Sequence, residues 1–357
     1  MKNLKLIGFL MILASSLMFI QCTSDPIPGT AGIDGIDGTS GLDGIDGLDG
    51  VGVQECVACH SNTDRDAIHD AYALSKHAIE TTMYDGSKLS QYGNRAECAA
   101  CHTNQGFIDR FDEQDMTLVG PYSTSSDQSI TCTGCHTSHR SFDFANDGND
   151  YALRTLAPVQ LVIDPTVSID SKNDADVLGY SNTCVNCHQP RTPAPTADVD
   201  GNANISSTHW GPHHGPQGTM LEGLGGASFL GQTTALPARG TAGHKTGASC
   251  VTCHMGEPTD VTDGSHTWNP TANACLECHD SEPEAVEGLE ASRATLLVAL
   301  QAKGVFDADG GVIPGTYPAA QVQAAFNYLF VEEDKSNGIH NPDYAKALVA
   351  NSIEALQ

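Results

Sequence analysis

The feature that most constrains this chain is a five-residue pattern, Cys-x-x-Cys-His, that occurs six times. It reads CVACH at 56–60, CAACH at 98–102, CTGCH at 132–136, CVNCH at 184–188, CVTCH at 250–254 and CLECH at 275–279. The 357 residues include 13 cysteines. Two cysteines in each of six motifs account for all of them except Cys22. Any fold of this chain must therefore present six cysteine pairs, each with a histidine directly after it.

Cys-x-x-Cys-His is the attachment site of c-type haem. Two thiols one helical turn apart add to the two vinyl groups of the haem, and the next imidazole reaches the iron. Zinc ribbons need no histidine after each pair, disulfide scaffolds do not repeat one, and thioredoxin-like redox motifs occur once. The pattern therefore predicts six haem c groups, each holding one iron.

The predicted haem-binding residues follow directly from the motifs. The thioether cysteines are Cys56, Cys59, Cys98, Cys101, Cys132, Cys135, Cys184, Cys187, Cys250, Cys253, Cys275 and Cys278. The proximal iron ligands are His60, His102, His136, His188, His254 and His279. No catalytic residue is predicted.

Each iron also needs a second axial ligand or has an open position. Of 15 histidines, 15 − 6 = 9 lie outside the motifs, which is enough for six irons. Methionine, the usual alternative, is scarce in the mature chain. We predict that the distal ligands come from seven of the nine: His77, His139, His213, His214, His244, His266 and His340.

Local context ranks these histidines. His77 and His69 share a helical run, and we prefer His77. In STHWGPHHGPQG (207–218) two Gly-Pro pairs bracket His213 and His214 in a stiff, non-helical loop. We expect His214 to be a ligand first, then His213, then His209. Either one of the adjacent pair binds iron while the other makes a hydrogen bond, or the two serve two haems.

His340 is predicted to stand just before a helix, with Asn341 as its N-cap and Pro342 at its first position.

The first 52 residues predict export and anchoring. Residues 1–21 combine Lys2 and Lys5 with an apolar run and form a signal peptide. Cys22 is the predicted lipidation site of a bacterial lipoprotein. Residues 22–52 then form a tether in which glycine recurs at every third position from Gly29 to Gly50. This collagen-like, aspartate-bearing repeat is expected to be an extended arm rather than a triple helix.

The folded part is expected to be mainly α with much irregular chain. Aromatic residues make up only 6% of the chain, so the haems themselves are expected to fill much of the core. We assign 53–280 to a hexahaem cytochrome domain and 281–357 to a C-terminal helical segment packed on it, with helices near 284–303, 318–331 and 342–356. A brief strand pair is expected within 156–169, and the segment from Asp198 is interpreted as a turn.

These features resemble the multihaem c-type cytochromes, specifically a hexahaem lipoprotein type, over residues 53–357. Besides the six motifs, SKHA (75–78), WGPHHGPQ (210–217), CVTCHM (250–255) and GIHNP (338–342) are similar to segments of such proteins. The resemblance implies electron transfer at the periplasm or outer surface, by an outer-membrane or cell-surface lipoprotein. Its partners would be other redox proteins (cytochromes) and a terminal electron acceptor. A net charge of −27 argues against nucleic acid.

Two alternatives stay open. One is a multihaem reductase of a nitrogen or sulfur oxyanion with one open haem. The C-terminal region resembles the pentahaem nitrite reductases, but their Cys-x-x-Cys-Lys motif does not occur in this chain. The other is a homopolymeric filament subunit.

Overall fold

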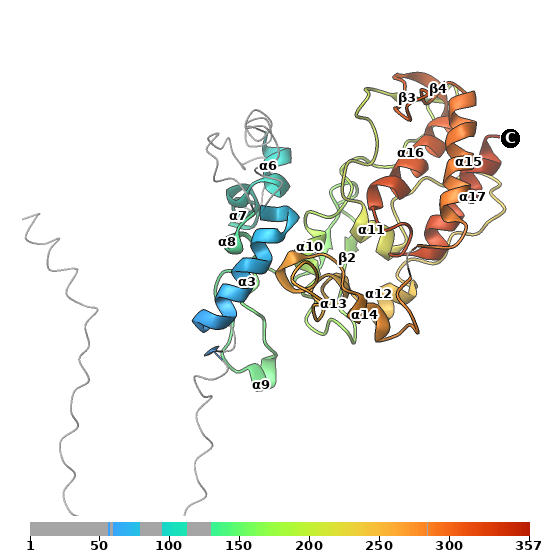
Figure 1. Cartoon of the computed structure of the whole chain (residues 1–357). Coiled ribbons are helices and arrows are strands. Elements are labelled where there is room, and N and C mark those ends of the chain that lie inside the picture. The colour runs from blue at the N-terminus through green and yellow to red at the C-terminus, as the bar shows by residue number, and fades with distance from the viewer. Residues whose placement is uncertain (1–55, 58–59, 79–94, 113–129, 284) are drawn as a thin grey trace, which may run out of the picture. The chain divides into compact units, whose positions relative to one another are not determined.

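The computed structural model describes residues 56–57, 60–78, 95–112, 130–283 and 285–357. The lipidation residue Cys22, the signal peptide, the glycine-repeat tether and the motif residue Cys59 lie outside this part. All described residues belong to one compact unit, Val51–Gln357. The predicted fold class, mainly α with much irregular chain, is confirmed (Figure 1).

The described helices and strands are mostly short. In chain order they are α3 (Asn62–Leu74), α6 (Ala96–His102), α7 (Asn104–Asp112), α8 (Cys132–Cys135), α9 (Phe144–Asp147), β1 (Val159–Gln160), β2 (Ser168–Ile169), α10 (Asn182–Val185), β3 (Asn202–Ile205), α11 (Gln217–Glu222), α12 (Gly243–Gly247), α13 (Cys250–His254), η2 (Ser265–Thr267), α14 (Ala272–Leu276), α15 (Leu289–Ala302), β4 (Gly315–Pro318), α16 (Ala319–Asp334) and α17 (Pro342–Ala355). Among the described helices, none has the length and apolar character needed to cross a bilayer.

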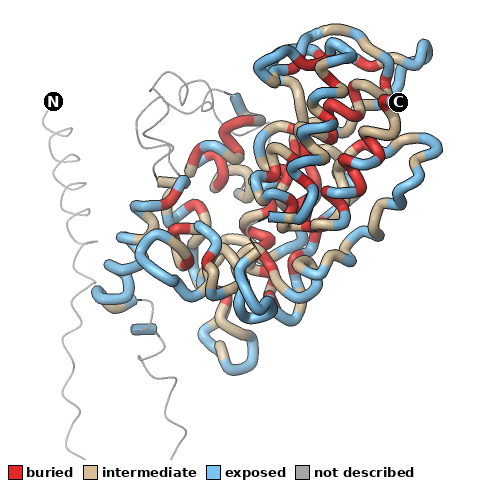
Figure 2. Tube along the Cα trace, turned by 45° about the vertical axis from the view of Figure 1, so that its right-hand side comes forward, coloured by how far each residue is buried: buried red, intermediate tan, exposed pale blue. Residues whose placement is uncertain are grey.

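The main apolar core lies among α15, α16 and α17, the three predicted C-terminal helices. Leu296 and Leu300 of α15 are fully buried, and Phe326 and Phe330 of α16 stack with ring centres 6.1 Å apart. Figure 2 shows buried chain concentrated inside this C-terminal part and exposed chain around it. Each fully buried Leu or Phe contributes about 1.5–3 kcal/mol. This bundle is therefore the part that can be stabilised by side chains alone.

The C-terminal bundle contacts the segment that precedes it in the sequence. Buried Asn327 of α16 accepts a hydrogen bond from the backbone of Ala227 at 2.7 Å and donates one back at 2.9 Å. The Tyr344 hydroxyl of α17 accepts from Gly226 at 2.9 Å. These bonds tie α16 and α17 to the loop after α11.

The predicted start of α17 is confirmed. The Asn341 side chain caps the helix by accepting from the Tyr344 backbone at 3.1 Å, and Pro342 begins it. Gly338 precedes this turn with φ +85°, where a Cβ would collide with Leu289. The cap and the glycine together fix the direction of His340 just outside the helix.

Two small antiparallel sheets complete the fold. β1 pairs with β2, which confirms the predicted strand pair. β3 pairs with β4, with Asn204 opposite Thr316. The interpretation of the segment from Asp198 as a turn is correct only for its first residues, where Asp198 Oδ1 accepts from the backbone of Asp200 and Asn202. The rest is β3, which pairs with a strand more than a hundred residues later.

The helix that carries His69 ends earlier than its apolar pattern predicts. α3 stops at Leu74, and Ser75 adopts an extended conformation with ψ 155°. The Ser75 backbone donates to Tyr72 and its hydroxyl accepts from Ala78 at 3.2 Å. A new short turn follows that carries His77. This break separates the direction of His77 from that of the helix.

Candidate haem-iron ligand pairs

The Cys-x-x-Cys-His motifs form or adjoin short helices. α6, α8, α10, α13 and α14 each contain one or both cysteines of a motif. A helical turn brings residues three apart to the same face, so both thiols of a motif can reach one group. The cysteines that the structure describes form no disulfides. They include Cys56 of the first motif, whereas Cys59 lies outside the described residues.

Each motif histidine faces one histidine from outside the motifs, and each partner is used once. The pairs and their ring-centre distances are His60–His139 (6.5 Å), His102–His213 (6.1 Å), His136–His266 (6.3 Å), His188–His77 (6.2 Å), His254–His340 (6.2 Å) and His279–His244 (6.0 Å). We number these pairs sites 1 to 6 in the order of their motifs.

The spacing of the pairs fits an iron between the rings. An imidazole nitrogen lies about 2.0–2.1 Å from a bound metal ion such as zinc. Two metal–nitrogen bonds in line, plus the distance from each nitrogen to the centre of its own ring, place the two imidazole ring centres about 6 Å apart. Two imidazoles that pack directly on each other need no space for a metal ion between them. Each pair would supply a haem iron with two imidazole ligands.

Six of the twelve paired rings are oriented by a hydrogen bond from Nδ1, the nitrogen farther from the metal when Nε2 is the ligand. The backbone carbonyls of Tyr151, Trp268 and Ile339 accept from His136 (2.7 Å), His254 (2.7 Å) and His244 (2.5 Å). The Gln217 Oε1 accepts from His188 at 3.2 Å. Such a bond fixes the tautomer with Nε2 free to bind iron.

Two paired histidines donate to a buried carboxylate instead. His139 Nδ1 donates to Asp150 at 2.6 Å, and His340 Nδ1 donates to Asp334 at 2.7 Å. The side chains of Asp150 and Asp334 are 8% and 0% exposed, so their charges are poorly screened by water. Sites 1 and 5 thus differ electrostatically from the other sites.

Burial keeps several distal imidazoles in the form that binds metal. It lowers the pKa of His77, His213 and His266 to about 4 each, and a neighbouring histidine or arginine lowers the pKa further. These rings are therefore neutral at pH 7. A neutral imidazole with a free nitrogen lone pair is the ligand that haem iron requires.

In the histidine-rich loop, it is His213 and not His214 that faces a motif histidine. His213 has φ +73°, and its Nε2 is buried without a hydrogen-bond partner. The His214 side chain is 79% exposed and its Nδ1 donates to Glu333 at 2.8 Å. This geometry reverses the sequence-based preference for His214, because the left-handed backbone at His213 turns that ring inward toward His102.

The two remaining histidines lie outside the pairs. His69 is exposed on α3, and His209 is exposed with its Nδ1 3.3 Å from the hydroxyl of Thr208. The other six sequence-predicted distal residues, with His214 set aside, each lie opposite a motif histidine.

Backbone strain also gathers around the pairs. Within the described residues, the non-glycine positions with positive φ are Tyr151, Ala152, His213, Ser265, Trp268, Lys335 and Asn337. All but Asn337 belong to a pair, adjoin a paired histidine, supply a carbonyl to one, or lie within two residues of Asp150 or Asp334. Such conformations cost about 1–3 kcal/mol each and cluster where function requires them.

Contacts between the motifs connect the sites. The side chains of Cys101 and Cys187 lie close together, as do those of Cys184 and Cys250, so site 4 lies next to sites 2 and 5. Helices α13 and α14, which carry the motifs of sites 5 and 6, pack together. His139 of site 1 follows the motif of site 3 by three residues.

Trp268 joins three sites. Its indole packs against His77 of site 4, with ring centres 4.7 Å apart, and against His266 of site 3 at 5.4 Å. Its carbonyl accepts from His254 of site 5. One residue therefore supports ligands at three neighbouring sites.

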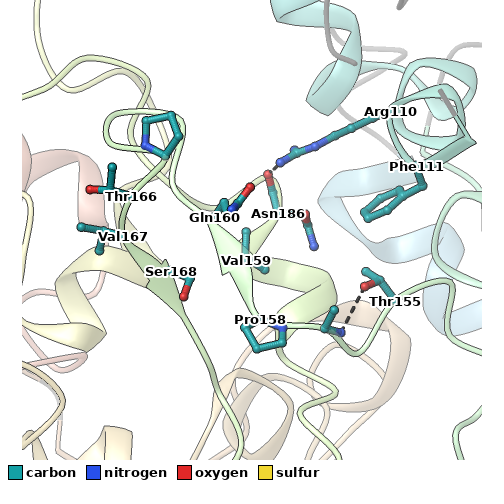
Figure 3. Close-up of a pocket in the computed structure, with 12 residues that line it drawn as sticks. Arg110, Phe111, Thr155, Pro158, Val159, Gln160, Thr166, Val167, Ser168 and Asn186 are labelled. Atoms are coloured by element: carbon teal, nitrogen blue, oxygen red, sulfur yellow. Dashed lines mark hydrogen bonds between the residues drawn. The ribbon is translucent and has the colours of Figure 1, made fainter. Parts of the chain in front are cut away.

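A pocket of about 580 Å³ lies beside sites 2 and 4. Arg110 and Phe111 of α7 line one side and the β1–β2 hairpin lines the other (Figure 3). Arg110 donates to the carbonyl of Asn186 at 2.7 Å, and its guanidinium lies 4.0 Å from Cys101 Sγ. A positive charge is thus placed next to a motif cysteine of site 2.

The chain has the motifs and the mainly helical fold of one class of protein, the multihaem c-type cytochromes, which bind haem c. It is similar to the C-type polyheme cytochrome OmcC of Geobacter sulfurreducens (strain ATCC 51573 / DSM 12127 / PCA), with 25% identity over 334 residues that cover 73% of this chain and 43% of OmcC. The chain thus spans less than half the length of that curated relative. No protein-family model matches it.

Two solved structures are also similar. The outer cell wall cytochrome OcwA has a TM-score of 0.48 and 21% identity, covering 80% of this chain and 50% of that one. The undecaheme cytochrome from the S-layer of Carboxydothermus ferrireducens has a TM-score of 0.46 and 19% identity, covering 79% and 40%.

Several residues around the pairs carry no signal in the sequence. Asp150, Asp334 and Gln217 lie 6 to 29 residues from the histidines that they contact. The carbonyl acceptors could not be found from sequence either, because any residue type has a carbonyl. These partners follow only from the fold.

Proposed function

We propose that the six histidine pairs are the axial ligands of six haem c groups and that the protein transfers electrons along them. The observation that carries this proposal is the one-to-one pairing of motif and non-motif histidines at 6.0–6.5 Å. Each haem c, when bound, supplies an iron that takes up or releases one electron. The chain contributes the imidazoles, orients six of the twelve through a hydrogen bond from Nδ1, and holds them in a fixed array.

The pairing favours an electron carrier over a reductase. A reductase of a small oxyanion needs an iron with an open position for its substrate. In the proposed arrangement each of the six irons has two imidazole ligands, so no position is left open for a substrate.

The contacts between sites support a continuous route. Cysteine contacts join site 2 to site 4 and site 4 to site 5, and helix packing joins site 5 to site 6. Trp268 adds site 3, and the chain between His136 and His139 adds site 1. An electron entering at any site then has a neighbouring site to move to.

The location is part of the same proposal. Residues 1–21 would direct export, acylated Cys22 would hold the protein on a membrane surface, and the glycine-repeat tether would let the cytochrome part stand away from it. An exported cytochrome of this kind would exchange electrons with other cytochromes and pass them to a terminal acceptor outside the cell. The names of OcwA and of the S-layer cytochrome describe proteins at such outer surfaces.

The test is a count of haems and of ligand states in the purified holoprotein. Mass spectrometry of its peptides should find a haem on each of six motifs. Optical and electron paramagnetic resonance spectra should show low-spin iron only, and the reduced protein should not bind carbon monoxide. Fewer than six haems would overturn the count, and a high-spin fraction near one iron in six that binds carbon monoxide would favour the reductase.

A further inference from the structure

We propose that buried charges next to the ligands give the six sites unequal reduction potentials, with Asp334 and Asp150 lowering those of sites 5 and 1 and Arg191 and Arg110 raising that of site 2. This inference rests on the proposed haem ligation. Unequal potentials add a direction to the proposed electron transfer, because electrons reside preferentially at the site of highest potential.

Asp334 has the stronger effect of the two carboxylates. It is fully buried at the end of α16, and its Oδ1 accepts from His340 Nδ1 at 2.7 Å. Its other carboxylate oxygen accepts from the Ser336 hydroxyl. In the part of the chain that the structure describes, no lysine or arginine lies within ion-pair distance of Asp334. Its negative charge is therefore directed at the imidazole.

A carboxylate at Nδ1 makes an imidazole a more basic ligand, and its charge acts over a short distance in a poorly solvated place. Both effects stabilise the oxidised iron, which carries one more positive charge than the reduced iron. Site 5 also has the carbonyl of Trp268 accepting from its other ligand, His254. We therefore expect site 5 to have the lowest potential.

Asp150 acts on site 1 in the same way but less strongly. It accepts from His139 Nδ1 at 2.6 Å, but also from the backbone of Arg140 at 2.7 Å and of Ala152 at 2.8 Å. The Arg140 guanidinium lies 3.6 Å away. These donors share the charge of the carboxylate, so site 1 should rank second lowest.

Site 2 has two arginines beside its motif cysteines, although the Glu333 carboxylate acts in the other direction by raising the pKa of His213. The guanidinium of Arg191 lies 3.8 Å from Cys98 Sγ, and that of Arg110 lies 4.0 Å from Cys101 Sγ. Arg191 also lowers the pKa of His213, although less than burial does. Nearby positive charge stabilises the reduced iron. Since site 4 lies between sites 5 and 2, the residues of this chain bias electrons from site 5 toward site 2.

The experiment is a reductive titration of the full holoprotein with dithionite as the one-electron donor. It is followed by visible absorbance and by the loss of low-spin ferric signals, in the native chain and in single variants. Asp334→Asn keeps an oxygen acceptor for His340 but removes the charge. In this variant the last component to be reduced should become easier to reduce. At a given potential its ratio of oxidised to reduced iron should fall at least tenfold, which corresponds to a rise of about 59 mV in its reduction potential for one electron. Asp150→Asn should shift the next-to-last component in the same direction, and Arg191→Gln should make the first component harder to reduce.

Glu333→Gln is the matched control. Glu333 directly precedes Asp334 but contacts His214, which belongs to no pair. This variant removes a carboxylate charge one residue away in the sequence that, among the described residues, makes no hydrogen bond to a paired histidine, and the lowest component should shift by less than twofold. Asp334→Glu, which keeps the charge, should leave the last component close to its native position.

The outcomes separate the two proposals. If the native protein has six low-spin haems and the two lowest components do not move in Asp334→Asn and Asp150→Asn, the charge proposal is wrong and the ligation stands. An equal shift in Glu333→Gln would also overturn it, because the hydrogen bond to the ligand would then be irrelevant. High-spin iron in the native protein would instead contradict the proposed function.

Discussion

The indole of Trp268 packs edge-on against the imidazole of His77, with ring centres 4.7 Å apart and an interplanar angle of 81°. Trp268 achieves this with a left-handed backbone, φ +53°. The same residue holds His266 with its ring and His254 with its carbonyl. A single side chain therefore limits the motion of proposed ligands at sites 3 and 4.

Trp268→Leu should loosen both ligands while leaving the backbone carbonyl in place. We expect a loss of roughly 2–3 kcal/mol in the free energy of unfolding, less than for a fully buried tryptophan because Trp268 is half-buried. Reduced protein should also begin to bind carbon monoxide at up to two of its irons. Trp210→Leu is the control, since Trp210 packs on Phe326 in the C-terminal core. Carbon monoxide binding in both variants, or in neither, would contradict a specific role of Trp268.

The histidine-rich loop gives a second prediction. His213→Ala should leave one iron in six without its distal ligand, because its ring lies 6.1 Å from that of His102. The spectrum should then show a high-spin component of about one sixth of the total. His214→Ala should keep all irons low-spin, since His214 is exposed and bonded to Glu333. The reverse result would restore the sequence-based order.

The sequence predicts what depends on local pattern. The six motifs, the three C-terminal helices and the cap at Asn341 all follow from residues a few positions apart. The preference for His214 over His213 follows from the same local pattern. That pattern does not predict the left-handed backbone at His213, which non-glycine residues rarely adopt and which decides the direction of the ring.

What the sequence could not predict depends on distant segments. The local pattern predicts a turn where β3 forms, and the strand exists only because it pairs with β4, more than a hundred residues later. The pairing of motif with distal histidine is also non-local: His77 lies opposite His188, and His102 opposite His213. A count of histidines shows that there are enough ligands, but only the fold shows which pairs form.

The C-terminal bundle should respond to core mutation independently of the haems. Leu296 of α15 is 0% exposed, whereas Val298 on the same helix is 64% exposed. Leu296→Ala should lower the free energy of unfolding by about 2–5 kcal/mol through lost burial and a cavity. Val298→Ala should change it by no more than about 0.5 kcal/mol. Denaturant unfolding followed by far-ultraviolet circular dichroism measures the free energy of unfolding of both variants. Similar losses in Leu296→Ala and Val298→Ala would show that α15 is not packed as described.

Tyr344 makes the stability of this bundle depend on alkaline pH. Burial raises the pKa of its hydroxyl from 10.0 to about 12, against the hydrogen bond from Gly226, which lowers the pKa. A folded-state pKa above the unfolded one gives stability that is present below pH 10 and lost as the pH rises through about 12. A rise of two pKa units corresponds to a loss of at most about 2.7 kcal/mol in the free energy of unfolding across this pH range.

Tyr344→Phe tests this dependence. The variant loses an acceptor for the Gly226 backbone at 2.9 Å, so at pH 8 it should be less stable than the native chain by about 1–3 kcal/mol. Between pH 10 and 12 the native chain should lose stability faster, and the difference between the two should narrow. The midpoints of urea unfolding of both proteins at pH 8, 10 and 11.5 measure this difference in stability. A constant difference across this range would mean that Tyr344 ionises as easily in the folded chain as in the unfolded one.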